Sequence, residues 1–192
     1  MRALPHYLAW MFGLAEAETQ TTAAERDCLA HHAAGRGALV EIGVWHGVTT
    51  KRLRSSMSGD GCLTAVDPFQ PGRLGFSLAE RIARREVDTI RNGRVRWIRD
   101  TGSAAARGHG MVDFIFIDGD HSEAGLLADW TAWHPLVLPG GIVALHDSRS
   151  TPTRQIDDAG SVIVTRRDIV PDPRFEVVAC VDSLTVLRRR ST

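Results

Sequence analysis

The chain has 192 residues, of which 43% are hydrophobic and 24% are charged, close to the average for a soluble globular domain. This composition excludes a disordered chain, and no apolar run approaches the roughly 20 residues of a membrane-spanning helix. Lys+Arg and Asp+Glu both number 23, which disfavours a nucleic-acid binder held by bulk charge. We therefore expect one domain, no membrane partner and little room for a separate substrate-binding unit.

The elements predicted in chain order begin with two short helices within residues 1–36, the second of which Thr21 or Thr22 would cap. Strands and helices then alternate. Strands are predicted at 38–44, 62–67, 95–99, 112–118 and 141–147, and helices at 48–57, 78–91, 103–108, 123–137 and within 155–169.

Two further strands, 175–181 and 183–190, are predicted at the end of the chain, joined by a tight turn at Asp182 and Ser183. They are too close for a crossover helix, so they must pair as an antiparallel hairpin. The alternation before them predicts an α/β fold, a mostly parallel sheet covered by helices on both faces. Ligands of such sheets bind at the carboxyl ends of the strands, so the residues that follow each strand are the candidates for a site.

The three cysteines, Cys28, Cys62 and Cys180, are far apart and show no zinc-binding spacing. Because an odd number argues against a disulfide framework, we expect reduced core residues in a cytoplasmic protein. The apolar stretch at the N-terminus reaches Glu16 and Glu18 without a long hydrophobic region, so a signal peptide is not expected.

The end of the first predicted strand carries Glu41 and Gly43, and the turn after it carries Trp45 and Gly47. Glycines at a strand-to-helix turn let backbone approach a ligand, and the helix N-terminus offers free N–H groups. The spacing lacks the middle glycine of the dinucleotide motif, and no P-loop Gly-Lys-Ser/Thr follows. Glu41 lies within an apolar strand, where a buried carboxylate needs donors such as a ligand ammonium or nearby amides.

Polar residues also end the second and third predicted strands. Asp67 lies 24 residues after Gly43, in the position of an acid that accepts two hydrogen bonds from a ribose. Thr101, Gly102 and Ser103 follow the third strand and could line a purine pocket, although Thr101 and Ser103 are also ordinary helix-capping residues.

Asp118 and Asp147 follow the fourth and fifth predicted strands, one αβ unit apart. Neighbouring strands are separated by roughly 4.8 Å, so the two carboxylates would repel unless a cation or a proton lay between them. Magnesium would satisfy both, and His146 points to the same edge. Alternatively, Asp118 caps a helix and Asp147 is a loop acid.

The segments VEIGVWHGVTT, TAVDPF, VDFIFIDGDHSEAG and LPGGIVALHD resemble the class I S-adenosylmethionine-dependent methyltransferases over about residues 36–148. The group they most resemble is the small-molecule O-methyltransferases, with their cephalosporin hydroxylase and macrolide-sugar methyltransferase relatives. The resemblance implies a Rossmann-like, doubly wound, seven-stranded sheet with strand order 3-2-1-4-5-7-6 and an antiparallel C-terminal hairpin.

The resemblance also implies residue roles. S-adenosyl-L-methionine would be held by the strand-end residues: its methionine part by Glu41, Gly43, Trp45 and Gly47, its ribose by Asp67, its adenine by Thr101, Gly102 and Ser103, with Asp118 close by. In the metal-dependent relatives a divalent ion, expected to be Mg²⁺, would be bound by Asp118, His146 and Asp147. Those relatives carry Asp-Asp or Asp-Asn where this chain has His146-Asp147, so His146 could instead be a base.

Methyl transfer requires the sulfonium and a nucleophilic oxygen to be held in line at near-contact distance. A metal would lower the pKa of the acceptor hydroxyl, and His121 or His146 could accept its proton, with Asp118 as a third catalytic candidate. We therefore expect metal-assisted O-methylation of a small hydroxylated metabolite. The alternatives are an RNA or protein methyltransferase, a non-catalytic S-adenosylmethionine-binding protein and, as the most distant, a NAD oxidoreductase.

The expected division of the chain is a helical segment at 1–36, acting as a pocket cover or dimer contact, and a cofactor-binding domain at 37–192. Only residues 1–30 and the loops 68–77 and 148–160 remain to contact the acceptor. A second subunit could complete the pocket, so a homodimer is expected.

Overall fold

The computed structural model describes residues 3–72 and 75–191, and the segment 68–77 of the predicted acceptor pocket therefore includes two residues, 73–74, outside the described chain. Seven strands form one sheet in the order β3-β2-β1-β4-β5-β7-β6. The strands are β1 (Ala38–Ile42), β2 (Cys62–Val66), β3 (Arg94–Ile98), β4 (Val112–Ile117), β5 (Val137–Leu145), β6 (Phe175–Val181) and β7 (Leu184–Arg189).

The first five strands run parallel, and β7 pairs antiparallel with both β5 and β6. This confirms the expected Rossmann-like sheet, its strand order and its antiparallel C-terminal hairpin. The turn of the hairpin contains Asp182 at φ 48°, a left-handed conformation that aspartate tolerates better than most side chains.

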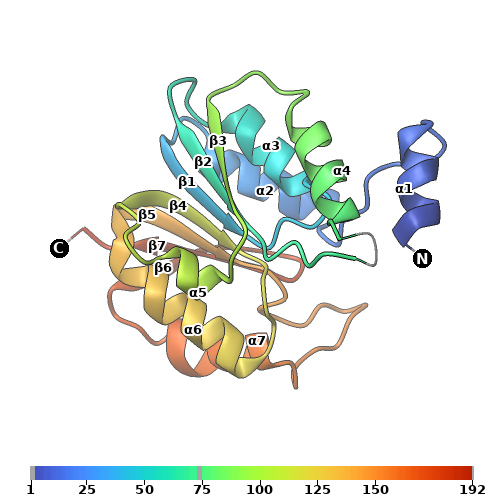
Figure 1. The fold of residues 1–192 in the computed structure, drawn as a ribbon. Helices are drawn as coiled ribbons and strands as arrows, with labels where there is room; N and C mark the ends of the chain where they lie inside the picture. The colour runs from blue at the N-terminus through green and yellow to red at the C-terminus, as the bar shows by residue number, and fades with distance from the viewer. Residues whose placement is uncertain (1–2, 73–74, 192) are drawn as a thin grey trace.

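Helices cover both faces of the sheet (Figure 1). One face carries α2 (Ala23–Ala33), α3 (Val48–Ser56) and α4 (Leu78–Val87), and the other carries α5 (Gly102–Ala105), α6 (Glu123–Trp133) and α7 (Gly160–Val164). A 3-10 turn (His134–Leu136) follows α6, and a π-helical turn (Thr165–Ile169) follows α7.

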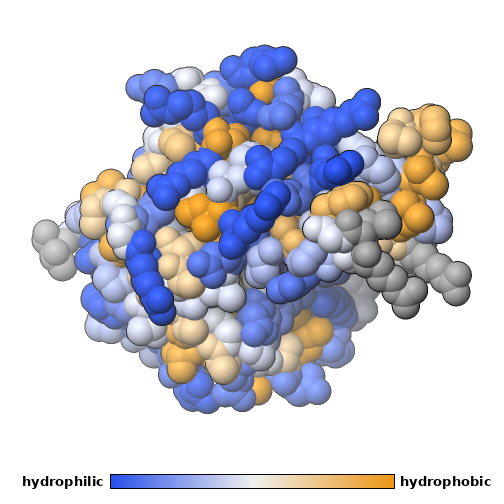
Figure 2. Space-filling model, in the orientation of Figure 1, coloured by the Kyte–Doolittle hydropathy of each residue, from blue (hydrophilic) through white to orange (hydrophobic). Residues whose placement is uncertain are grey.

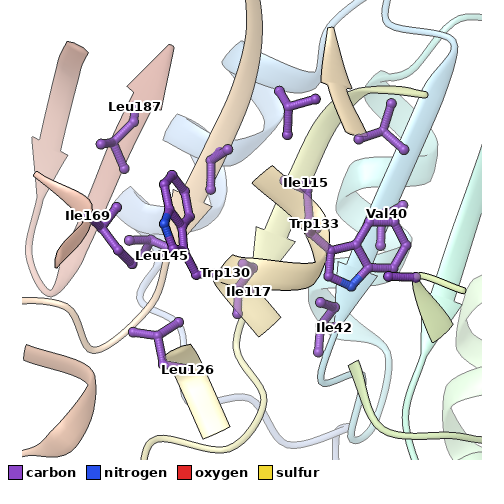
Figure 3. Close-up of a cluster of buried hydrophobic side chains, with 14 of the residues drawn as sticks. Val40, Ile42, Ile115, Ile117, Leu126, Trp130, Trp133, Leu145, Ile169 and Leu187 are labelled. Atoms are coloured by element: carbon purple, nitrogen blue, oxygen red, sulfur yellow. The ribbon is translucent and has the colours of Figure 1, made fainter. Parts of the chain in front are cut away.

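The alternation of side chains along β1 explains this two-sided packing. Leu39 belongs to a buried cluster with Leu29 of α2 and Leu53 of α3, whereas Val40 and Ile42 belong to a second cluster with Trp130 and Trp133 of α6. Successive residues of a strand point to opposite faces, so one strand supplies both cores. Figure 3 shows the second cluster, in which the Trp133 ring lies beside Val40 and Ile42.

Several element boundaries differ from those predicted from the sequence. β5 begins at Val137 rather than at residue 141, because the Pro139-Gly140-Gly141 stretch joins the strand within an irregularity of its pairing with β4. Helix α4 ends at Val87 rather than at residue 91. There the Arg54 side chain donates to the carbonyl oxygens of Val87 and Asn92, each at 2.9 Å, and so satisfies a free carbonyl of the last turn.

The cysteines also differ from expectation. All three are free, as predicted, but Cys180 is exposed and Cys28 and Cys62 are only partly buried. The prediction that they are core residues is therefore wrong. Cys62 opens β2 and Cys180 lies near the end of β6, which is an outer strand of the sheet, so neither lies at its buried centre.

Helix α1 (Ala3–Met11) stands apart from the sheet at the N-terminal end and packs mainly against α4 (Figure 1). Apolar residues near α1 form an orange group on the surface at the upper right of Figure 2. The exposed apolar side chains of this segment are Leu4, Leu8, Met11, Phe12 and Leu14. Among the described residues, no helix has both the length and the apolar character that crossing a bilayer requires.

Candidate active site

A cavity of about 590 Å³ opens at the carboxyl ends of β1 to β4, where the sequence placed the candidate residues. Its wall is formed by the residues after these four strands, by part of α6, and by the link between α1 and α2. The cavity is lined by Glu18–Gln20, Ile42–Trp45, Val48, Thr49, Val66–Pro68, Asp100–Ser103, Asp118–His121, Gly125, Ala128 and Asp129.

Gly43 is required by the close approach of β1 to β4. A Cβ at this position would meet the backbone oxygen of Asp118 at 1.9 Å, and its φ is +85°. Both conditions exclude a larger side chain. The glycine therefore serves the junction of two strands, and through that junction it shapes the floor of the cavity.

Asp67 ties the ends of β1 and β2 together. Its Oδ2 accepts hydrogen bonds from the amides of Val44 and Trp45, both at 3.0 Å, and its Oδ1 accepts from the amide of Phe69 at 2.7 Å. Trp45 and Phe69 both have positive φ, at 49° and 43°. Such strained residues persist where surrounding contacts hold them, and they are typical of ligand sites.

Two of the residues predicted to bind the cofactor do not line the cavity. Gly47 caps α3 at φ 75°, where a Cβ would meet Ala83 of α4 at 2.9 Å, so its role is helix packing. Glu41 is fully buried in β1, and neither of its carboxylate oxygens has a hydrogen-bond partner among the described residues. Burial, reinforced by the charges of Asp118 and Asp67, raises the pKa of Glu41 well above its usual value.

The end of β3 brings Thr101, Gly102 and Ser103 to the cavity, as predicted. The Trp133 indole donates to the Gly102 carbonyl at 2.8 Å and fixes this turn on α6. Asp129 of α6 lies against Gly102, because a Cβ there would meet Asp129 Oδ1 at 2.5 Å. Burial raises the pKa of Asp129 to about 6.

A network of acids and bases lies at the ends of β4 and β5. Asp118 Oδ1 lies 2.8 Å from His146 Nδ1 and 3.2 Å from His121 Nε2. On the far side of His146, Nε2 lies 3.4 Å from Glu25 of α2. His121 Nδ1 in turn lies 3.3 Å from Asp147, whose two oxygens both pair with Arg154.

The charges of this network balance. Although burial opposes the charged form of His146, its contacts with Asp118 and Glu25 raise the pKa of this side chain to about 10. Hydrogen bonds with Asp118 and Asp147 raise the pKa of His121 to about 9. Two imidazolium groups and Arg154 therefore face the carboxylates of Asp118, Asp147 and Glu25.

A family model of a methyltransferase domain matches residues 40–148, more than half of the chain and the part that carries β1 to β5 and the cavity. The chain belongs to this methyltransferase family. This confirms the resemblance of the sequence to the class I S-adenosylmethionine-dependent methyltransferases.

Solved structures similar to this methyltransferase share its fold at low sequence identity. The cofactor-bound Rv0187 from MTB is 17% identical with a TM-score of 0.73, and the match covers 100% of this chain and 91% of that one. The O-methyltransferase TomG from Streptomyces achromogenes, in complex with SAM, is 16% identical with a TM-score of 0.62 and the same coverage. A putative rRNA methylase from Clostridium thermocellum is 14% identical with a TM-score of 0.61, covering 89% of this chain and 100% of that one. No curated protein sequence matches the chain.

The side chains of the methyltransferase do not fit the magnesium site predicted at Asp118, His146 and Asp147. Both oxygens of Asp147 pair with the Arg154 guanidinium, so this carboxylate already has a cation as its partner. Both ring nitrogens of His146 lie near carboxylates, Nδ1 at 2.8 Å from Asp118 and Nε2 at 3.4 Å from Glu25. Magnesium also prefers oxygen ligands, whereas the donor atoms that come within 4.8 Å of one another belong to Asp118, His121 and His146.

Sequence reasoning missed three members of the site. Glu25 lies in α2, outside the matched region, but a capping box at Thr22 and Glu25 is visible in the sequence as Thr-x-x-Glu. Arg154 lies in a loop without a motif, and Asp129 lies on the inner face of α6. For these two no sequence signal distinguishes a site residue from a surface charge.

Proposed function

We propose that this methyltransferase transfers the methyl group of S-adenosyl-L-methionine to an oxygen of a small hydroxylated metabolite. The observation that carries the proposal is that one cavity gathers the end of β1, Asp67, the Thr101–Ser103 turn and the pair Asp118 and His121. Its volume of about 590 Å³ lies in the range of small-molecule sites, roughly 300–1,000 Å³.

In this proposal the cofactor lies along the strand ends. Asp67 accepts one amide at Oδ1, so this oxygen keeps a lone pair for a ribose hydroxyl. The turn Thr101–Ser103, with Asp129 beside it, surrounds the adenine. The methionine part extends over Gly43 and Trp45, which leaves the methyl group directed toward Asp118 and His121.

The chemistry proposed for the acceptor uses these two residues. The acceptor oxygen attacks the methyl carbon as the bond from sulfur to that carbon breaks, and the hydroxyl proton passes to the Asp118 carboxylate. His121, held as an imidazolium by Asp118 and Asp147, stabilises the negative charge that develops on the oxygen. His146 was a sequence candidate for the base, but it is buried and does not line the cavity, so we assign it the role of orienting Asp118.

Metal assistance, which the sequence suggested, is not part of this proposal, because the Arg154 guanidinium already neutralises Asp147. The remaining steps depend on positioning, which by itself lowers barriers substantially when reacting groups are held in line. The protein thus needs to exclude water and orient two small molecules in one cavity.

A small acceptor is favoured over RNA because several arginines that could contact phosphates are paired with acids of the protein. Arg84 and Arg99 both pair with Glu80, at 2.9 and 2.8 Å. Arg188 and Arg190 of the C-terminal run both pair with Glu176, at 2.7 and 3.4 Å. These charges are partly neutralised and do not form an open phosphate-binding surface.

Transfer of a radiolabelled methyl group distinguishes the candidates. Purified protein is incubated with labelled S-adenosylmethionine and either a panel of phenols, catechols and sugar alcohols or total RNA. The proposal predicts label in small acceptors, lost in Asp118→Asn and retained in Asp88→Asn, which changes an exposed acid at the end of α4 that does not line the cavity. Label in RNA alone, or cofactor binding without transfer to any acceptor, would contradict it.

A further inference from the structure

A second cavity, of about 270 Å³, lies beside the first between α1, the loop after β1 and α4. Glu18 and Trp45 line both cavities, so the two are adjacent. Three potential metal ligands face the smaller one, and they come from three different segments: His6 from α1, Glu18 from the link to α2, and His46 from the loop.

The three side chains are close to one another, with both histidines buried and Glu18 partly exposed at 31%. His6 is 5% exposed and His46 is 6% exposed, and their rings stack with centroids 5.1 Å apart. Glu18 Oε1 lies 3.6 Å from His6 Nδ1, and one donor atom from each residue lies within 4.8 Å of the others.

The imidazole of His6 lacks a hydrogen-bond partner among the described residues. Neither of its ring nitrogens is hydrogen-bonded to any of the residues in 3–72 and 75–191, although both are buried. A buried polar group left unpaired destabilises the folded state, so a ligand that pairs with the His6 ring would be favoured at this position.

We propose that His6, Glu18 and His46 bind one divalent transition-metal ion of the zinc type. Two imidazoles and one carboxylate are a recognised ligand set for Zn²⁺, with water completing a tetrahedron. Tetrahedral ligands at about 2.0–2.1 Å from zinc are separated from one another by roughly 3.4 Å. The distance of 3.6 Å between His6 and Glu18 is already close to this value. Magnesium and calcium are disfavoured because they prefer oxygen ligands.

Binding requires one local exchange. His46 Nδ1 accepts a hydrogen bond from the Glu18 amide at 3.1 Å, which fixes its proton on Nε2. The metal would take the place of this amide at Nδ1, and the amide would turn to water in the adjoining cavity. The exchange replaces one hydrogen bond with three coordination bonds.

The proposed ion is a clamp and takes no part in the reaction. It would join α1 and the link to the loop that carries Trp45, and residues 18–20 of that link line the larger cavity. Metal binding would therefore hold the N-terminal segment over the cofactor site, whatever reaction that site performs.

Metal titration of the full chain tests the proposal. Chelator-treated protein is titrated with ZnCl₂ by calorimetry and with CoCl₂ by visible absorption. We expect one equivalent bound, a tetrahedral cobalt spectrum and a rise in Tm. His6→Ala and Glu18→Gln should each weaken zinc binding at least tenfold. Because either change could disturb folding, His6→Gln and circular dichroism of each metal-free variant accompany them.

Two control variants locate the ion. His31→Ala removes an exposed histidine of α2, and His121→Ala alters the other cluster of possible ligands, so both should retain zinc binding. Absence of zinc binding by the wild-type protein would overturn the proposal and show that water alone fills the cavity. Binding that survives His6→Gln but is lost in His121→Ala would overturn it equally, by placing the ion at Asp118.

Discussion

Arg154 and Asp147 form a two-point ion pair at the carboxyl end of β5, with Arg154 Nη2 2.7 Å from Asp147 Oδ2. Asp147 is buried and has a positive φ of 46°, so its side chain is held in one direction by its backbone and its partner. Arg154 and His121 therefore contact the Asp147 carboxylate, which the sequence assigned to a metal.

Magnesium should therefore not affect catalysis. The expected result is that adding Mg²⁺ to chelator-treated protein leaves the initial rate of methyl transfer unchanged, because Arg154 already supplies the positive charge at Asp147. Rates measured with and without the ion check this. A several-fold activation by Mg²⁺ would mean that Arg154 leaves Asp147 when the ion binds.

Removal of the Arg154 side chain should destabilise the fold. In Arg154→Gln the buried Asp147 loses its main cation, which we expect to lower the free energy of unfolding by about 2 kcal/mol, less than for a fully buried pair because Arg154 is half exposed. Urea denaturation measures it. Arg166→Gln, which breaks an exposed pair with Asp157, is the control and should cost less than about 1 kcal/mol.

The stability contributed by Glu25 should depend on pH. Burial would raise its pKa, but His146, Thr22 and Ser183 together lower it to about 2, below the usual value of 4.5. An acid with a depressed pKa stabilises the folded state above its unfolded pKa, and this contribution is lost as the pH falls from 4.5 toward 2. Glu25→Gln should thus be less stable than wild type by about 2–3 kcal/mol at pH 7, with the gap closing in acid.

Denaturation of both proteins across this pH range measures the effect. Glu176→Gln serves as a control, since Glu176 forms surface pairs with Arg188 and Arg190. A constant gap between wild type and Glu25→Gln at every pH would show that the loss comes from packing rather than from the charge of Glu25.

Asp129 should show the opposite pH dependence. Burial raises its pKa to about 6, so the unfolded chain releases this proton at lower pH than the folded one, and stability falls as the pH rises from about 4 to about 6. Asp129→Asn should therefore be more stable than wild type by about 2 kcal/mol at pH 7 and equal to it near pH 4. If Asp129 also contacts the cofactor, the same variant will bind it more weakly, which calorimetry measures.

Gly43→Ala should disrupt the cavity floor. The new Cβ would lie 1.9 Å from the Asp118 backbone oxygen, so β1 and β4 must separate. We expect the free energy of unfolding to fall by at least about 3 kcal/mol and cofactor binding to be lost. Gly108→Ala is the matched control, because its φ of +71° is similar but its Cβ would meet nothing within 4 Å. That control should cost only about 1 kcal/mol. Equal losses of stability in Gly43→Ala and Gly108→Ala would show that the contact with Asp118 is not what requires glycine at position 43.

The sequence predicted a mostly parallel sheet because its strands are short apolar runs separated by helix patterns, whereas the strand order came from the resemblance to the methyltransferases. It also located the cavity, because the strand-end residues Asp67, Thr101 and Asp118 meet wherever such a sheet forms. The sequence could not show that Asp147 pairs with Arg154, since this contact depends on the path of a loop without a motif.

The same limit applies to the role of Glu41. A carboxylate in a strand suggests a ligand contact, but only the fold shows that the side chain is buried away from the cavity wall. Glu25 was missed for a related reason. Its capping box predicted the start of a helix, whereas its contact with His146 arises because α2 packs across the sheet from a distant part of the chain.

The central claim is that S-adenosylmethionine occupies the cavity at the ends of β1 to β4. A crystal structure of the protein with S-adenosylhomocysteine tests it most directly. We predict the ribose at Asp67, the adenine at Thr101–Ser103 and the sulfur facing Asp118 and His121. An empty cavity at saturating ligand, or an adenine bound anywhere else, would contradict the account.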